Sequence, residues 1–348
     1  MKSSLAPIAR RIANSTRIAL LLFLGGLCSP MLARAEVSLP HVFGSHMVLQ
    51  REKPLTIWGW ASPNEKVTVT LGTATASAQA NDKGEWKVVL PAMKAGGPYT
   101  LTVSGSSTVT FDDVMIGEVW LCSGQSNMEF GIGNGHNAKE EIANANHPGI
   151  RLLMVDNHWD PQPQSDMKGD WKVCTPESVA QGGWNGFSAV GYFFGRELNE
   201  KLGVAVGLID ADWGGTRIES WTPPEGFAAV PALKNEYEKV QLGDPRTALH
   251  QERLGQTLDQ FEQWEKAARQ AMTAKEVVPP VPNYPDELRP PHDLQQATAL
   301  YNGMIHPLVP FAIRGAIWYQ GESNVGEGMR YAERMKSLLA GWRALWGE

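Results

Sequence analysis

Cysteine is scarce in this 348-residue sequence, which contains only Cys28, Cys122 and Cys174. Structural zinc sites usually combine four cysteine or histidine ligands at short spacings, and no such cluster occurs here. A disulfide-rich scaffold is also excluded, because three cysteines form at most one bridge within the chain. Whether Cys122 and Cys174 pair or remain two buried thiols is left open by the sequence. No metal site is predicted.

Long apolar runs are missing as well. The uncharged run from Ile18 to Leu27 is too short to span a bilayer comfortably, and it follows three arginines near the N-terminus. Ala33-Arg34-Ala35 then supplies a small-x-small cleavage pattern. These features predict a signal peptide over residues 1–35, cleaved after Ala35, with no membrane anchor. The protein is therefore expected to be exported, to the periplasm or the medium.

Positive charge is also in short supply, since the formal net charge of the chain is −6. The predicted signal peptide holds five basic residues and no acidic one, so its removal takes the charge to −11. A chain this acidic repels polyanions. Nucleic acids and anionic membranes are excluded as expected partners.

Residues 36–112 alternate short β-rich runs with turn clusters such as Ser62-Pro63-Asn64 and Gly96-Gly97-Pro98. This spacing predicts a small antiparallel β-sandwich domain. Its expected strands are Leu55–Trp60, Lys66–Leu71, Glu85–Leu90 and Tyr99–Val103.

From residue 113 to residue 348, apolar strands alternate with segments of helix length, a pattern typical of a parallel sheet covered by helices in the α/β class. The segment Val190–Leu202 has a helical apolar stripe and stops at Gly203, a natural helix end. An insertion is expected over about 223–292, with a charged helix and then a Pro-rich run, interpreted as a rim of the cleft. The expected strands lie near Glu118–Leu121, Arg151–Val155, Val204–Asp210 and Gly315–Tyr319.

Three polar, glycine-containing strings each follow an expected strand. The first is Gly124-Gln125-Ser126-Asn127-Met128, the second surrounds Gly214-Gly215, and the third is Gln320-Gly321-Glu322-Ser323-Asn324. Parallel strands bring such strings to one edge of a sheet, where ligands bind in open α/β folds. A serine beside free backbone N–H groups suits nucleophilic catalysis, although each string alone is also compatible with an ordinary turn or helix cap. Met128 replaces the second glycine of Gly-x-Ser-x-Gly, which disfavours an α/β-hydrolase elbow.

These strings resemble the motif blocks of the SGNH-hydrolase superfamily, and the run Gly117–Glu129 is similar to the sialate O-acetylesterase family in particular. The resemblance implies an SGNH-type three-layer α/β/α hydrolase domain after the β-sandwich. It also implies that Ser126 is the nucleophile and that Gly215, with Gly214 as the near alternative, and Gln320 stabilise the oxyanion. No cofactor is implied. Further substrate-binding candidates around these blocks are Gln125, Asn127, Glu129, Trp213, Gly214, Arg217, Trp221, Glu322 and Asn324.

A catalytic base is harder to find. Families of this kind take it from a downstream Asp-x-x-His-type block, and no such block occurs in the sequence. The apolar stripe of Tyr331–Trp346 also predicts a crossover helix that should feed another strand. We therefore expect an N-terminal fragment of a longer enzyme, inactive or weakly active alone, with His306 as the alternative base within the chain.

The predicted activity is hydrolysis of acetyl esters on sugars by a serine carboxylic-ester hydrolase, with an acetylated sugar or oligosaccharide as partner. Whether that sugar is sialic acid or belongs to acetylated xylan or xyloglucan stays open. A non-catalytic carbohydrate-binding protein is the alternative from another class. A lipase or thioesterase would need an apolar groove near Ser126, whereas the following run Gly131–Asn137 is polar and glycine-rich.

Overall fold

The computed structural model of the protein describes residues 36–348, so the predicted signal peptide lies outside the described residues. Within residues 36–348, no helix combines the length and the apolar character needed to cross a membrane. The predicted strands at 55–60, 66–71, 85–90 and 315–319 are confirmed residue for residue.

The first part of the chain is antiparallel, as its turn spacing predicts. Strands β2 and β5 form a two-stranded sheet, while β4, β3, β6 and β7 are neighbours in that order in a larger one. Alternate residues point inward, so that Ile57, Val69 and Val88 are buried in one cluster between the sheets. The strands are β2 (Leu55–Trp60), β3 (Lys66–Leu71), β4 (Ala74–Gln79), β5 (Glu85–Leu90) and β6 (Gly96–Ser104).

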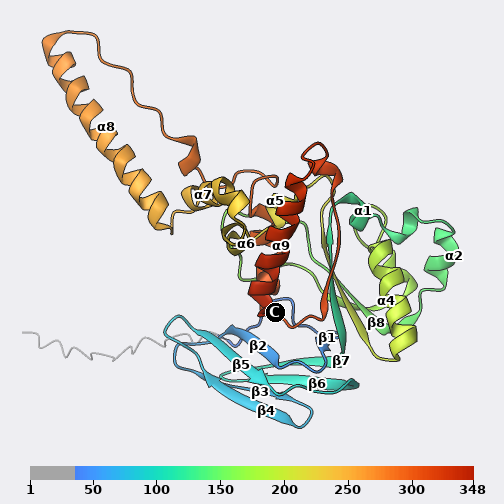
Figure 1. Ribbon diagram of the computed structural model, residues 1–348. Helices are drawn as coiled ribbons and strands as arrows, with labels where there is room; N and C mark the ends of the chain where they lie inside the picture. Colours follow the sequence, from blue (N-terminus) through green and yellow to red (C-terminus); the bar gives the residue numbers. More distant parts are fainter. Residues whose placement is uncertain (1–35) are drawn as a thin grey trace, which may run out of the picture. The chain divides into compact units, whose positions relative to one another are not determined.

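Strand β7 is much longer than the predicted segment Glu118–Leu121 and extends from Thr108 to Gly124. Its first half pairs with β6 in antiparallel fashion, and its second half pairs with β10 and β11 in parallel. The predicted domain boundary at residues 112 and 113 therefore falls inside a continuous strand (Figure 1). The division into two domains stays a prediction.

The second part of the sheet is parallel and has the order β11, β7, β10, β8, with β9 antiparallel at the edge. Tyr319 of β11 and Asp212 of β10 both pair with Gly124 of β7, so the three strands end at one level. The short strands β1 and β9 were not anticipated. The bounds are β1 (Val48–Gln50), β8 (His147–Met154), β9 (Trp171–Cys174), β10 (Val206–Asp212) and β11 (Gly315–Tyr319).

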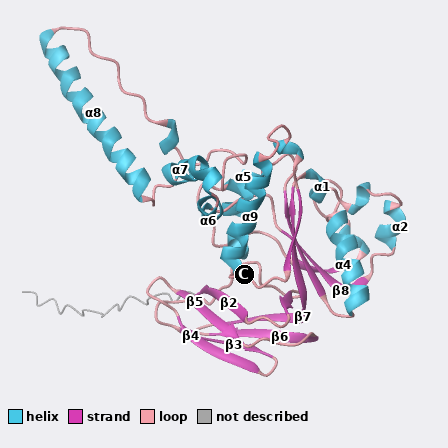
Figure 2. Ribbon diagram, in the orientation of Figure 1, coloured by secondary structure: helices cyan, strands magenta, loops and turns pink. Residues whose placement is uncertain are grey.

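Helices cover both faces of this sheet (Figures 1 and 2), as the fold-class prediction requires. Cys122 and Leu208 pack in the cluster that includes Tyr192 of α4, whereas their neighbours Leu121 and Ile209 pack on the opposite face. The second half of β7 and all of β10 are thus buried on both sides, which explains their nearly continuous apolar sequences. The main helices are α4 (Ala189–Leu202), α5 (Ile218–Trp221), α6 (Pro224–Ala229), α7 (Lys234–Gly243), α8 (Ala248–Ala274) and α9 (Arg330–Trp346).

The predicted insertion contains α8, whose 27 residues bury only His250 and Thr257. The indole N–H of Trp264 donates to the carbonyl of Pro279 at 2.8 Å and ties the Pro-rich segment to the helix. The remaining helical turns are short. They are α1 (Ser126–Glu129), η1 (Ile132–Asn134), α2 (Ala138–Ala143), α3 (Pro176–Val179), η2 (Pro231–Leu233), η3 (Asp286–Leu288), η4 (Tyr301–Ile305), η5 (His306–Leu308) and η6 (Glu322–Asn324).

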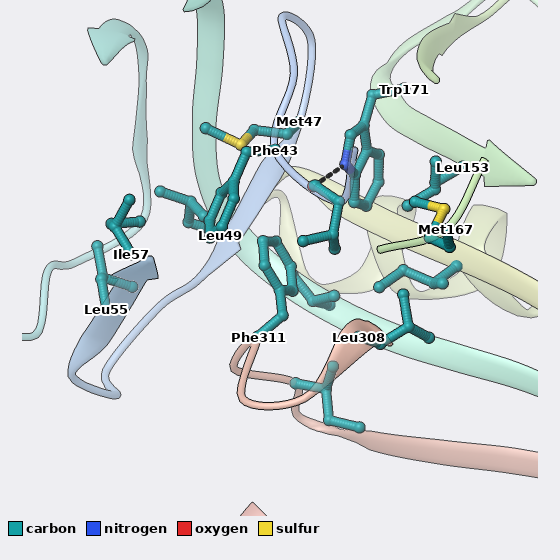
Figure 3. Packing of buried hydrophobic residues seen from close by; sticks show 14 of the residues in the cluster. Phe43, Met47, Leu49, Leu55, Ile57, Leu153, Met167, Trp171, Leu308 and Phe311 are labelled. Atoms are coloured by element: carbon teal, nitrogen blue, oxygen red, sulfur yellow. Dashed lines mark hydrogen bonds between the residues drawn. The ribbon is translucent and has the colours of Figure 1, made fainter. Parts of the chain in front are cut away.

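One apolar cluster links the antiparallel and parallel parts (Figure 3). The ring of Phe311 lies 5.5 Å from that of Phe43 and 6.4 Å from that of Trp171. The Trp171 indole also donates a 2.8 Å hydrogen bond to the carbonyl of Val42, so its one polar atom is satisfied. Residues far apart in sequence therefore fix the base of the sheet whose other end carries the candidate site.

Candidate active site

The three predicted motif blocks meet where β7, β10 and β11 end. The backbone N–H of Gln125 donates to the carbonyl of Tyr319 at 3.0 Å, and that of Trp213 donates to the carbonyl of Gly124 at 3.2 Å. Gly124 has φ +147°, and a Cβ there would lie 2.1 Å from the carbonyl oxygen of Tyr319. Only glycine permits this approach, which brings the third block against the first.

Ser126 is the first residue of α1 and is half-buried. A Cβ placed on Gly214 would lie 3.4 Å from the Cβ of Ser126 and 2.5 Å from Glu129 Oε2. The missing side chain therefore lets the second block pass directly beside the predicted nucleophile. The contact between Ser126 and Gly214 could not be predicted from the sequence, because the two residues are far apart in the chain.

The backbone N–H groups of the two adjacent glycines differ in their availability. Gly214 donates its N–H to Glu129 Oε2 at 2.6 Å, whereas the N–H of Gly215 makes no hydrogen bond within residues 36–348. Gly215 is exposed, has φ +75°, and accepts a 2.9 Å bond from Gln295 Nε2 at its carbonyl. Of the two glycines, Gly215 therefore has the donor that remains free.

Gln320 is placed differently from the sequence expectation. Its Nε2 donates to the carbonyl of Thr216 at 3.0 Å and to Asn324 Oδ1 at 2.8 Å, and its Oε1 accepts from the hydroxyl of Tyr331 at 2.8 Å. Both N–H groups of the amide are thus engaged, and no donor is left for an oxyanion in this arrangement. The side chain instead joins the loops that follow β10 and β11.

Two candidate substrate-binding residues are buried, and their side-chain amides bond to neighbouring loops. Gln125 is 2% exposed and its Oε1 accepts from the backbone N–H groups of Gly321 and Ser323. Asn324 is 3% exposed, accepts from the N–H of Ile218, and donates to two carboxylates. Their amides hold the loops together, because these hydrogen bonds join the residues after β7 and after β10 to those after β11.

The charged candidate Arg217 belongs to an ion-pair network with Glu219 and Glu327, which also includes the buried Arg334. Trp221, the other candidate for a substrate wall, is 0% exposed and packs edge-to-face on Trp318 at 6.2 Å. That interpretation of Trp221 is wrong, because its indole fills the core and no substrate can reach it.

The other candidates lie at or near the surface. Trp213 is partly buried, and Asn127 donates its side-chain N–H to the exposed carboxylate of Glu322. Glu129 accepts a hydrogen bond from Gly214 and also lines a small pocket beside Asp210 and Asp212. Of the sequence candidates, Ser126, Gly214, Gly215 and Glu129 therefore form one continuous group.

Asp210 and Asp212 form a buried acidic pair that sequence reasoning did not anticipate. Burial raises the pKa of Asp210 to about 6, and burial together with the charge of Asp210 raises the pKa of Asp212 well above its ordinary value. Their spacing in the sequence could have indicated this pair, because residues i and i+2 of a strand point to the same face. Two carboxylates this close together and this buried therefore disfavour simultaneous ionisation.

A pocket of about 170 Å³ opens beside this pair. Its polar lining consists of Glu129, Asp156, Asn157, Asp210 and Asp212, and glycines of the loop 182–186 close it. In the same loop the side chain of Trp184 is exposed, at 49%. This tryptophan, which the sequence did not single out, is the one with the most exposed ring near the site.

None of the eight histidine rings is hydrogen-bonded to Ser126. His306 lines a different hollow, with Trp58 and Trp60, and its Nδ1 lies 2.6 Å from the carbonyl of Gln164. The alternative of His306 as the base therefore has no support from its position. Within the described part of the chain, no group of three or more His, Cys, Asp or Glu residues is arranged to hold a metal ion, and Cys122 and Cys174 are buried free thiols.

Comparison with known proteins agrees with this geometry. The family model for sialic acid-specific acetylesterases, a carbohydrate esterase family, matches residues 116–242. The sialate O-acetylesterase of Rattus norvegicus is 32% identical over 86% of this chain and 54% of its own length, and that of Homo sapiens is 30% identical over 85% and 51%. A carbohydrate acetylesterase structure from Xanthomonas citri aligns with TM-score 0.68 and 32% identity, over 90% of this chain and 58% of that one.

The matched region begins in β7, before Ser126, and includes Gly214 and Gly215, two of the three motif blocks. The chain spans about half the length of the curated relatives it matches. It therefore belongs to the sialate O-acetylesterase family of carbohydrate esterases.

Proposed function

We propose that this chain carries the nucleophile of an exported carbohydrate O-acetylesterase, and that Ser126 is that nucleophile. The observation that carries the proposal is the position of Ser126 at the end of β7, beside Gly214 and at the level where β10 and β11 also end. Family membership supports an acetylated carbohydrate as substrate. Export rests on the sequence pattern of residues 1–35 alone.

In the proposed reaction, Ser126 Oγ attacks the carbonyl carbon of the acetyl group while a base removes the hydroxyl proton. The negative charge that develops on the carbonyl oxygen is stabilised by the backbone N–H groups of Ser126 and Gly215, neither of which makes a backbone hydrogen bond within residues 36–348. Collapse of the tetrahedral intermediate breaks the ester C–O bond and returns the proton to the sugar oxygen. Water then hydrolyses the acetyl-enzyme.

The base is proposed to be a histidine from outside residues 36–348. This follows from the hydrogen bonds of the histidines in the described residues, none of which involves Ser126. A serine hydroxyl is a weak nucleophile near neutral pH, so the reaction needs such a group. Glu129 is a poor substitute, because Gly214 already donates to one of its oxygens.

The test of the proposal combines acetate release with covalent labelling in a protein that contains this chain. A serine-reactive organophosphonate should form an adduct at Ser126, mapped by peptide mass spectrometry, and should stop acetate release from an acetylated sugar in proportion to labelling. An adduct at another serine, or full labelling without loss of turnover, would contradict the assignment. Sugar binding with no acetate release would favour the non-catalytic alternative.

Gln320→Ala separates a positioning role from an oxyanion role. Because the Gln320 amide joins the loops at Thr216 and Asn324, its loss should lower both the unfolding free energy, by roughly 1–3 kcal/mol, and kcat. Thermal unfolding and steady-state kinetics are the measurements. Tyr331→Phe, which removes the hydroxyl that donates to the side-chain oxygen and the backbone carbonyl of Gln320 but leaves the Gln320 amide in place, should give a smaller version of both effects. A kcat lowered by about 10²-fold with unchanged stability would instead assign the amide to the oxyanion.

A further inference from the structure

The pocket beside Glu129 lies next to the proposed nucleophile. Glu129 lines the pocket through its side chain and also accepts the N–H of Gly214, the residue that passes beside Ser126. A group bound in the pocket would therefore contact Glu129, whose other neighbour Gly214 lies beside Ser126. At about 170 Å³ the pocket is smaller than the ~300–1,000 Å³ typical of drug-sized ligands, so it suits a single ring.

The polar lining of the pocket offers acceptors and no positive charge. Its lining residues include the acids Glu129, Asp156, Asp210 and Asp212, and none is a lysine, arginine or histidine. Asp210 and Asp212 are 6% and 8% exposed, and their side chains interact with each other, while no other group in residues 36–348 donates to Asp210 Oδ1 or Asp212 Oδ2. Buried carboxyl oxygens without donors favour a ligand that brings hydroxyl groups, and they repel a ligand that brings a carboxylate.

Trp184 adds an exposed aromatic ring in the loop whose glycines Gly182, Gly183 and Gly186 line this pocket. Its backbone has φ +35°, an unusual value for a bulky residue, and its carbonyl accepts a 2.7 Å bond from Asn134 Nδ2. Its ring meets that of Phe130, the residue after Glu129, edge-to-face at 5.4 Å. The exposed indole is therefore held in place beforehand, which lowers the entropic cost of stacking a ring on it.

We propose that Trp184 and the acidic pocket beside Glu129 form a subsite for an uncharged sugar ring. This inference rests on the proposed function and specifies its substrate class: the acetylated sugar is neutral and lacks the carboxylate of a sialic acid. The indole covers the apolar C–H face of the ring. The hydroxyl groups donate to the carboxylates and to Asn157.

The test compares two probes that differ only at C6, methyl 3-O-acetyl-β-glucopyranoside, which has a hydroxymethyl group there, and the corresponding glucuronoside, which has a carboxylate. Binding is measured by calorimetry on the Ser126→Ala form of the protein that contains this chain, so that neither probe is consumed. The neutral probe should bind at least about tenfold more tightly than the charged one. The ratio of the two dissociation constants should come closer to one in Asp156→Asn and at high salt. Glu276→Gln, a change of an exposed acid outside the pocket, should leave the ratio unchanged.

Trp184→Ala should weaken binding of the neutral probe by about tenfold, whereas Trp184→Phe should retain most of the parent affinity. Tyr284→Ala removes an exposed aromatic ring outside the pocket and should not change the affinity. Equal affinity for both probes, indifference to Trp184→Ala in folded protein, or no binding of either probe would overturn the inference. Acetate release by the unmodified protein, and its loss in Ser126→Ala, reports on the proposed function separately. The result of the acetate assay does not depend on which of the two probes binds more tightly.

Discussion

Ser126→Ala is expected to lower kcat for acetyl-ester hydrolysis by a factor on the order of 10⁵–10⁶, because no covalent acetyl-enzyme can form without the hydroxyl. KM should change little, since Ser126 lies at the reacting centre and contributes little to binding the sugar. The fold should be unaffected, because a half-buried serine at the start of a four-residue helix loses one small polar group. The measurement is steady-state acetate release from an acetylated sugar by a protein that contains this chain.

Ser123→Ala is the matched control. Ser123 lies near the end of β7, three residues before Ser126, is completely buried, and its Oγ has no hydrogen-bond partner within residues 36–348. Its replacement should leave kcat within about twofold and should not destabilise the fold, because an unpaired buried hydroxyl is costly to retain. Retained turnover in Ser126→Ala, or its loss in Ser123→Ala alone, would move the nucleophile away from Ser126.

Asp212→Asn is expected to stabilise the protein at pH 8 by roughly 1–3 kcal/mol. The folded-state pKa of Asp210 is about 6, above its ordinary 3.8, and that of Asp212 is also raised well above its ordinary value by burial and by Asp210. From about pH 4 upward the folded state therefore holds protons that the unfolded state has released, so this pair makes the free energy of unfolding fall as pH rises. For Asp210 alone the shift corresponds to about 3 kcal/mol at full ionisation.

The asparagine variant removes one of the two interacting charges, so its stability gain should grow from pH 4 to pH 8. Urea unfolding of both forms across this range measures the difference directly and cancels the contribution of other titrating groups. Asp156→Asn is the control, because this aspartate lines the same pocket but is exposed. A variant that is less stable than the parent at pH 8, or a gain in stability that does not change with pH, would contradict the interpretation that ionising this buried acidic pair destabilises the fold.

Local patterns in the sequence were sufficient for four strands and for helix α4. Strands β2, β3, β5 and β11 begin and end where the turn residues and apolar alternation place them, and α4 begins at Ala189 and stops at Gly203 in the left-handed conformation. Such signals are short-range, because a strand's alternation and a helix's cap involve neighbours in the chain. The length of β7 escaped prediction, because its middle changes from antiparallel to parallel partners and only those partners define it as one strand.

The sequence by itself determined the α/β class, the three motif blocks after strands and the choice of Ser126 as candidate nucleophile. Only the tertiary structure decided what each polar side chain in those blocks contacts: it placed Gln320 and Asn324 in loop-to-loop hydrogen bonds, Trp221 in the core and Trp184 at the surface. The physical reason is that residue type and spacing report the local backbone. Burial and hydrogen-bond partners depend instead on residues about 100 positions away, such as Thr216 for Gln320, which meet only when the sheet is assembled.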